Sequence, residues 1–126
     1  MKNPSQRAIE FGQSIWYDNI SRDLLNSGEL KKIVSDWGIR GLTSNPSIFD
    51  NAIRSSSTYD SQIDQIKSQI DCPEKIFNEL AIDDISRAAD LLKPIYEQSN
   101  SVDGYVSIEV SPLLARDAEG LSLIHI

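Results

Sequence analysis

Residues 41–50 read GLTSNPSIFD, and the interpretation of the whole chain depends on this stretch. A short apolar run ends in Thr43, Ser44 and Asn45, and Pro46 then restricts the backbone. Ser44 or Asn45 before a proline can simply satisfy a turn, so a surface loop is one interpretation. The alternative is a buried strand whose polar end enters a functional site. The sequence on either side favours this alternative.

Two other stretches repeat the pattern of a short apolar run followed by polar residues. Residues 13–20, QSIWYDNI, are rich in bulky and β-branched side chains, and Asp18 stands near their far end. Residues 104–112, GYVSIEVSP, alternate apolar and polar side chains, with Glu109 near the end. We therefore expect three short buried strands.

The segments between these strands have helical spacing. Asn26 and Glu29 resemble a capping box before the apolar positions of residues 30–37, and Gly38 is a typical helix stop. Residues 47–54 can form a helical turn, and residues 57–70 keep one apolar face.

A longer helical stripe follows. Asp71 is a candidate cap for residues 73–92, which we expect to form two helical pieces, and Pro94 should end or kink the second. The order strand, helix, strand, helical excursion, strand is typical of βα units. It predicts an α/β fold with a parallel sheet of about three strands.

In parallel βα architectures, functional side chains gather at the carboxyl ends of the strands. This rule selects Asp18, Thr43, Asn45 and Glu109. Each has an ordinary structural alternative: Asp18 could cap the following helix, Asn45 could satisfy the turn, and Glu109 could face solvent. Their shared position at strand ends favours a common site, in which two carboxylates could perform acid and base steps.

A covalent reaction with a carbonyl substrate would need a desolvated lysine. The chain has six lysines, none in a predicted strand, and all are expected on solvated surfaces: Lys2, Lys31, Lys32, Lys67, Lys75 and Lys93. His125 has no evident partner, so a catalytic role is not expected for it.

Composition restricts the class of protein. The 126 residues are 40% hydrophobic and carry a net charge of −7, which fits one globular domain and disfavours nucleic acid and anionic membranes as partners. Cys72 is the single cysteine, so no intrachain disulfide or cysteine-based metal site is expected. The N-terminus lacks a signal-peptide core and no window resembles a membrane span, so we expect a soluble, cytoplasmic protein without a metal.

The stretch GLTSNPSIF resembles the signature of the transaldolase family, with agreement at Gly41, Thr43, Asn45, Pro46 and the pair Ile48–Phe49. The segments SIWYDNISRDLL and GYVSIEVSPLLARD also resemble family segments, in the same order. The resemblance covers roughly residues 5–120 and is closest to the bacterial branch.

The resemblance implies a (β/α)₈ TIM barrel and transfer of a dihydroxyacetone unit from sedoheptulose 7-phosphate to glyceraldehyde 3-phosphate through a lysine Schiff base, in the pentose phosphate pathway and without a cofactor. By motif, Asp18 would exchange a proton with a substrate hydroxyl as the carbon–carbon bond breaks. Thr43 and Asn45 would line the substrate site. Glu109 would act through a water as the imine forms and hydrolyses.

The family's Schiff-base lysine lies on the next strand, and nothing in this chain matches it. We therefore expect residues 1–126 to be the N-terminal part of a single barrel domain, inactive alone, with residues 121–126, LSLIHI, as a possible non-native tail. A fructose 6-phosphate aldolase-like enzyme and a non-catalytic interaction module are the alternatives. The helical excursion of residues 55–99 argues against the first, and no oligomeric state is predicted.

Overall fold

The computed structural model describes residues 2–120, which contain a three-stranded parallel sheet in the order β1-β2-β3. The strands are β1 (Trp16–Asp18), β2 (Gly41–Thr43) and β3 (Tyr105–Val106). Asp18 pairs with Thr43, and Leu42 pairs with both Tyr17 and Val106. The predicted parallel α/β arrangement of three strands is therefore confirmed.

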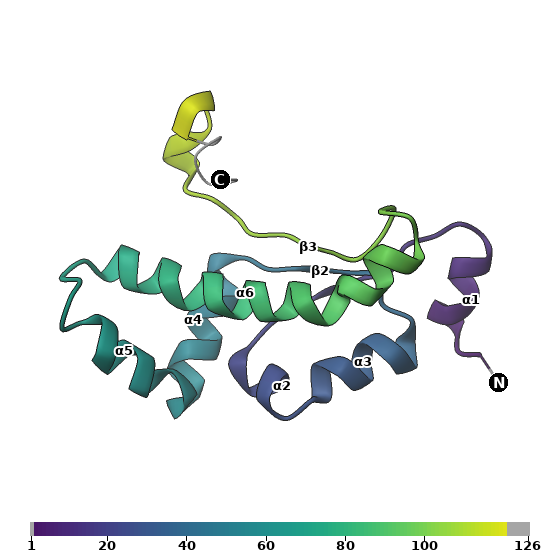
Figure 1. Ribbon diagram of the computed structural model, residues 1–126, viewed down its shortest axis with the longest axis horizontal. Coiled ribbons are helices and arrows are strands. Elements are labelled where there is room, and N and C mark those ends of the chain that lie inside the picture. The colour runs from purple at the N-terminus through teal and green to yellow at the C-terminus, as the bar shows by residue number, and fades with distance from the viewer. Residues whose placement is uncertain (1, 121–126) are drawn as a thin grey trace.

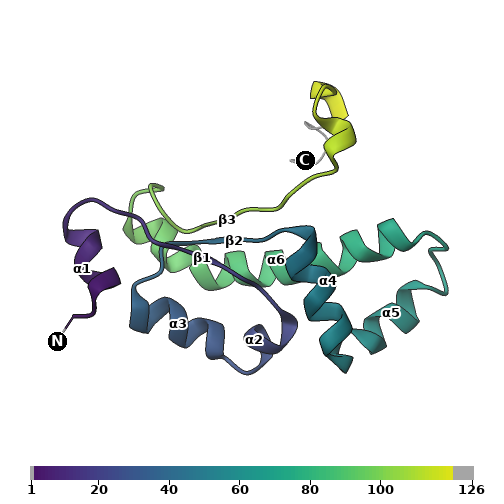
Figure 2. The same ribbon diagram turned by 180° about the vertical axis from the view of Figure 1, so that it is seen from behind.

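The helices that follow β1 and β2 lie on one side of this sheet, as Figures 1 and 2 show from opposite directions. The chain after β3 departs to the other side (Figure 1). The helical elements are α1 (Pro4–Glu10), α2 (Arg22–Asn26), α3 (Glu29–Trp37), α4 (Pro46–Ser55), η1 (Ser57–Tyr59), α5 (Asp60–Ile66), α6 (Pro73–Gln98) and η2 (Pro112–Leu114).

The main core lies between the sheet and these helices. Leu42 of β2 is fully buried there, among Leu30 of α3 and Ala88 and Leu92 of α6. A second, smaller core joins α4, η1 and α6 through Ala52, Tyr59 and Leu80. Each strand directs alternate side chains into the main core, because successive residues of a strand point to opposite faces of the sheet.

The opposite face of the sheet is uncovered within residues 2–120. Trp16 and Tyr105, which flank Gly41 in the sheet register, are 40% and 45% exposed. The Trp16 ring lies over Gly41, where an added Cβ would come within 2.5 Å of the ring. Asp18 and Thr43 are two residues further along their strands, so their side chains point to this same uncovered face.

Two of the predicted helix caps are wrong. Asn26 is the last residue of α2, a helix that the capping-box interpretation overlooked, and Gly28 precedes α3 without a side-chain cap. Cys72, not Asp71, is the residue before α6, again without a side-chain cap. The predicted stop at Gly38 is confirmed, because this residue has a φ of 66°, in the left-handed region that glycine adopts readily.

The prediction of two helical pieces is also wrong, because α6 is one helix of 26 residues, and Pro94 lies inside this helix and does not end it. Proline removes one backbone hydrogen bond, here the one that would end on the carbonyl of Asp90. Both Asp90 and Pro94 are exposed, so water can reach that carbonyl. Leu92 and Ile95 on the core side hold the helix together across this point.

β3 is much shorter than the predicted strand of residues 104–112, and Tyr105 is exposed rather than buried. The Ser107 N–H still donates to the Leu42 carbonyl at 2.9 Å, and pairing then stops. The reason lies in β2, which turns into α4 at Asn45 and Pro46 and so offers no further partner.

Candidate functional site

The carboxyl ends of β1 and β2 bring two of the predicted site residues into contact. The Thr43 hydroxyl donates a hydrogen bond to Oδ1 of Asp18 at 2.7 Å. The parallel register places the two residues side by side, on the face of the sheet that the helices leave open. Asp18 is exposed and Thr43 is half-buried, so a small molecule can reach the carboxylate.

Asp18 does not cap the following helix. The residue before α2 is Ser21, whose hydroxyl accepts the Leu24 N–H at 3.2 Å. The structural alternative for Asp18 is therefore wrong, and its carboxylate is not used to begin α2.

Asn45 performs the turn function that the alternative interpretation gave it. Its Oδ1 accepts the Ile48 N–H at 2.9 Å, and Pro46 occupies the first position of α4, where its missing N–H costs nothing. Its Nδ2 makes no hydrogen bond to any other residue in the 2–120 range, so this donor can still serve a ligand. Capping fixes the side chain in one orientation, and the two uses are compatible.

Ser44 is a structural residue that the sequence analysis treated only as a turn former. Its side chain is buried, and its hydroxyl donates to the Ser107 carbonyl at 2.8 Å. This bond ties the end of β2 to the chain that leaves β3. It extends the connection between the two strands beyond their short ladder.

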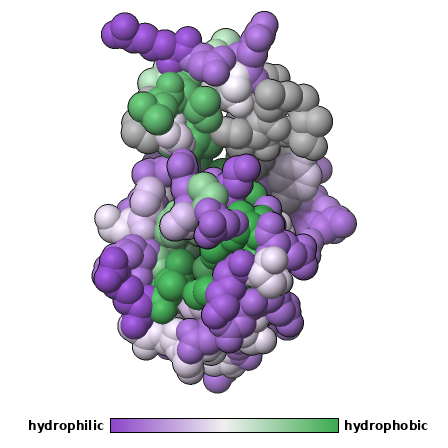
Figure 3. Space-filling model, turned by 90° about the vertical axis from the view of Figure 1, so that its left-hand side faces the viewer, coloured by the Kyte–Doolittle hydropathy of each residue, from purple (hydrophilic) through white to green (hydrophobic). Residues whose placement is uncertain are grey.

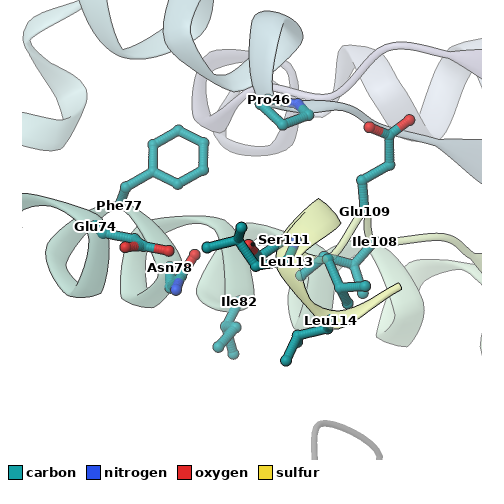
Figure 4. Close-up of a pocket in the computed structure, with 11 residues that line it drawn as sticks. Pro46, Glu74, Phe77, Asn78, Ile82, Ile108, Glu109, Ser111, Leu113 and Leu114 are labelled. Carbon is teal, nitrogen blue, oxygen red and sulfur yellow. Dashed lines mark hydrogen bonds between the residues drawn. The ribbon is translucent and has the colours of Figure 1, made fainter. Parts of the chain in front are cut away.

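Glu109 is exposed, and it lines a groove of about 560 Å³ between the start of α6 and residues 108–114. Figure 3 views this end of the molecule and shows apolar side chains gathered in the hollow below the C-terminal segment. In Figure 4 the Glu109 carboxylate points toward the side of Pro46, while Phe77 and Ile82 come from α6. Most of the residues that line the groove are apolar: Pro46, Phe77, Ile82, Ile108, Val110, Leu113 and Leu114. The other polar residues of its lining are Glu74, Asn78 and Ser111.

The structure thus brings Asp18 and Thr43 together, and places Asn45 at the start of α4 between them and the groove. Glu109 makes no hydrogen bond within the described chain, and the groove that it lines reaches the first residue of α4, Pro46, the neighbour of Asn45. Among residues 2–120, no cluster of three or more His, Cys, Asp or Glu side chains is suited to a metal ion. No described helix has both the length and the apolar character needed to cross a membrane.

A buried group of charged residues, which the sequence pattern did not predict, lies behind this site. Arg22 at the start of α2 forms an ion pair with Asp84 of α6, which is 0% exposed, and Tyr59 hydrogen-bonds to both. Burial, followed by the neighbouring Asp84 carboxylate, raises the pKa of the Tyr59 hydroxyl well above its usual range, so it stays protonated. The signal in the sequence was the adjacent acidic pair Asp83–Asp84 inside the apolar stripe of α6.

A parallel sheet with carboxylate and hydroxyl groups at the carboxyl ends of its strands is the arrangement found in enzymes of the (β/α) barrel class. Residues 15–122 match the family model Transaldolase/Fructose-6-phosphate aldolase. The chain belongs to this family, and its fold is consistent with part of a (β/α)₈ barrel.

Curated relatives agree with this assignment. The chain is 50% identical over 111 residues to Transaldolase 2 of Nostoc sp. (strain PCC 7120). The matched region makes up 87% of this chain and 29% of that protein. It is 44% identical over 118 residues to a transaldolase of Thiobacillus denitrificans, covering 94% of this chain and 33% of the relative. A transaldolase of Mycobacterium bovis is 40% identical over 119 residues, with 94% and 32% covered. The chain therefore spans about a third of the length of these relatives.

Proposed function

We propose that this chain is the N-terminal part of a cytoplasmic transaldolase. The complete enzyme would transfer a dihydroxyacetone unit from sedoheptulose 7-phosphate to glyceraldehyde 3-phosphate through a lysine Schiff base. The observation that carries the proposal is the contact between Asp18 and Thr43 at the open ends of two parallel strands, in a chain of this family. The names of the matched relatives favour transaldolase over fructose 6-phosphate aldolase activity.

Asp18 is the proton-transferring residue of the proposed reaction. As a carboxylate it can accept a proton from a substrate hydroxyl as the carbon–carbon bond breaks, and return it when the bond forms with the acceptor. The Thr43 hydroxyl holds one carboxylate oxygen, and the other accepts no hydrogen bond from residues 2–120. This arrangement orients the proton acceptor before the substrate arrives.

Asn45 and Glu109 complete this chain's share of the site. The Asn45 amide, fixed by its bond to Ile48, is placed to donate through Nδ2 to a substrate hydroxyl. Glu109 acts through a water during formation and hydrolysis of the imine. Glu109 lines the groove beside Pro46, where a substrate and a water could both be held.

The nucleophilic lysine of the proposed reaction would come from a part of the enzyme outside this chain. Lys31 and Lys32 lie on α3, Lys75 and Lys93 lie on α6, and all four are exposed. Lys2 and Lys67 are exposed too, and they form ion pairs with Glu10 and Asp64. A lysine nucleophile needs a desolvated amine, and none of these side chains is buried. The chain alone should therefore form no Schiff base.

A hybrid enzyme tests the proposal. It carries the matching residues of this chain in place of those of Nostoc sp. Transaldolase 2, followed by the rest of that relative. We expect the hybrid to convert sedoheptulose 7-phosphate only when glyceraldehyde 3-phosphate is present as acceptor. A folded hybrid without this activity would contradict the proposal, and cleavage of fructose 6-phosphate without an acceptor would favour the aldolase alternative.

Borohydride trapping tests the missing lysine. The chain and the hybrid are each incubated with fructose 6-phosphate and borohydride, and their masses are measured. We expect a covalent adduct on the hybrid and none on the chain. An adduct on the chain would show that one of its own lysines is the nucleophile.

A further inference from the structure

Arg22, Tyr59 and Asp84 form a closed ring of hydrogen bonds behind the candidate site. The Arg22 backbone N–H donates to the Tyr59 hydroxyl at 2.8 Å, and that hydroxyl donates to Oδ2 of Asp84 at 2.8 Å. Nε of Arg22 donates to Oδ1 of the same carboxylate at 2.9 Å. The guanidinium also reaches Asp83 at 3.1 Å and Gln62 at 2.5 Å, and it lies 4.4 Å from the centre of the Tyr59 ring.

Stability alone does not explain this ring. Removing two charges from water costs several kcal/mol, and apolar residues of similar volume often replace buried ion pairs without loss. What such a ring can supply is a defined geometry, because each partner has only one arrangement that satisfies its neighbours. The ring contacts two segments of the chain, one after β1 and one after β2.

The first segment in contact with the ring is the loop that follows β1. Arg22 is the first residue of α2, and a helix leaves the N–H groups of its first turn without partners inside the helix. The Tyr59 hydroxyl supplies the missing acceptor. Ile20 is fully buried and Ser21 caps α2, so residues 19–21 are held between the strand and the ring. Asp18 is the residue immediately before this held segment.

The second segment in contact with the ring is the one that follows β2. Tyr59 ends the stretch of α4 and η1 that begins at the cap residue Asn45. Its ring packs with Ala52 of α4 and Leu80 of α6 in the second core. One ring of side chains therefore joins α2, η1 and α6, and so fixes the ends of both strands that carry candidate site residues.

We infer that Arg22, Tyr59 and Asp84 are positioning residues, which set the orientation of Asp18 and of the Asn45 cap by fixing the segments after β1 and β2. The consequence for catalysis rests on the proposed function. None of the three touches the face where a substrate would bind. They act through the backbone of the two segments.

Amide hydrogen exchange on the full chain tests the positioning itself. The Arg22 amide should be protected at least about tenfold more than the amide of Glu29, the first residue of α3, which is exposed and bonds only to the Ser27 hydroxyl at 3.3 Å. Tyr59→Phe removes the acceptor and should abolish the difference. Equal exchange at the two amides in the unaltered chain would overturn the inference, even if the variant fails to fold.

Steady-state kinetics of the hybrid enzyme test the effect on catalysis. Tyr59→Phe should lower kcat about tenfold to a hundredfold and change KM by less than about threefold, because displacement of a proton-transferring group slows the chemical step. Ala88→Gly is the control: it disturbs a fully buried position of α6 one turn beyond Asp84, outside the ring. It should lower stability and leave kcat within about twofold.

The outcomes separate the two proposals. An inactive but folded hybrid contradicts the proposed function, and the exchange result still decides whether the ring holds the segment. An active hybrid in which Tyr59→Phe keeps full kcat, or in which Ala88→Gly lowers kcat equally, overturns the positioning role. Protection of Arg22 together with a selective loss of kcat supports it.

Discussion

Gly104 is the residue at which the chain entering β3 approaches α6 too closely for any side chain. Its φ is 91°, and an added Cβ would lie 2.4 Å from the backbone nitrogen of Tyr96. Gly104 N–H also donates to the Arg40 carbonyl at 2.7 Å, at the start of the β2 segment. The backbone of a helix cannot move away as the end of a long side chain can, so this glycine sets how close β3 lies to α6.

Gly104→Ala should therefore lower the free energy of unfolding by about 3 kcal/mol or more, from backbone strain together with overpacking. Gly12→Ala is the matched control, because Gly12 has a φ of 77° but open space around its Cα. It should cost only about 1 kcal/mol. Urea unfolding of both variants measures the two values, and equal losses would show that the contact with α6 is unimportant.

Tyr59 should make the protein sensitive to alkaline pH. Burial raises the pKa of its hydroxyl, so the folded state keeps this proton more tightly than the unfolded chain, whose tyrosine titrates near about pH 10. The contribution is fully present below pH of about 10 and falls as the pH rises further, by at most about 1.4 kcal/mol per pH unit. The charged residues in contact with the hydroxyl are Arg22 and Asp84, and Asp83 contacts the Arg22 guanidinium.

Urea unfolding between about pH 9 and 11 measures this effect in the unaltered chain and in Tyr59→Phe. The variant should show a smaller loss of stability over this range, since it has no proton to release. The comparison removes the background from the other tyrosines and the lysines. Parallel pH profiles would contradict the raised pKa.

Among the elements, α6 is the one whose sequence and structure disagree most. It continues through Pro94 to Gln98, and its last turn places Tyr96 edge-on against Tyr105 of β3, with ring centres 5.5 Å apart. Pro94→Ala restores a backbone hydrogen bond and relieves a clash in the helix interior. We expect the free energy of unfolding to rise by about 1–3 kcal/mol, measured by urea unfolding. A lower stability would mean that Pro94 is needed to bring Tyr96 to β3.

The alternation of strands and helices could be predicted from apolar spacing, because the segments containing Trp16, Leu42 and Val106 are each followed by turn-forming or polar residues. The residues that cap the helices could not be predicted in the same way. Asn26 and Glu29 have capping-box spacing, but Gly28 between them adopts a φ of 73° and is the residue before α3. The length of β3 depends on the residue at which its partner β2 ends, and the sequence of β3 carries no information about that residue.

The candidate site was predictable to a similar degree. Asp18 and Thr43 follow from strand ends and parallel register, and the structure confirms that they meet. The ring of Arg22, Tyr59 and Asp84 was not predictable, because its members are separated by 37 and 62 residues in the chain. Only the folded arrangement of α2, η1 and α6 brings them together.

At the scale of the whole molecule, one layer of helices covers one face of a three-stranded sheet (Figures 1 and 2). Within residues 2–120 the other face carries the exposed aromatic rings of Trp16 and Tyr105. Such a face should bind the apolar dye ANS. Trp16→Gln should lower the dye fluorescence of the chain at least about twofold. Trp37→Gln, which alters a more exposed ring on α3, should leave it nearly unchanged. Equal decreases would show that the open sheet face is not the apolar surface that matters.

The central claim is that the carboxylate at the end of β1 performs proton transfer, and one comparison in the hybrid enzyme tests it most directly. Asp18→Asn keeps the shape of the side chain and its contact with Thr43 but cannot accept a proton, and Asp23→Asn makes the same change at an exposed residue in the first turn of α2. We predict that kcat falls at least about a hundredfold for Asp18→Asn and stays within about twofold for Asp23→Asn. Full activity of a folded Asp18→Asn hybrid would contradict the account.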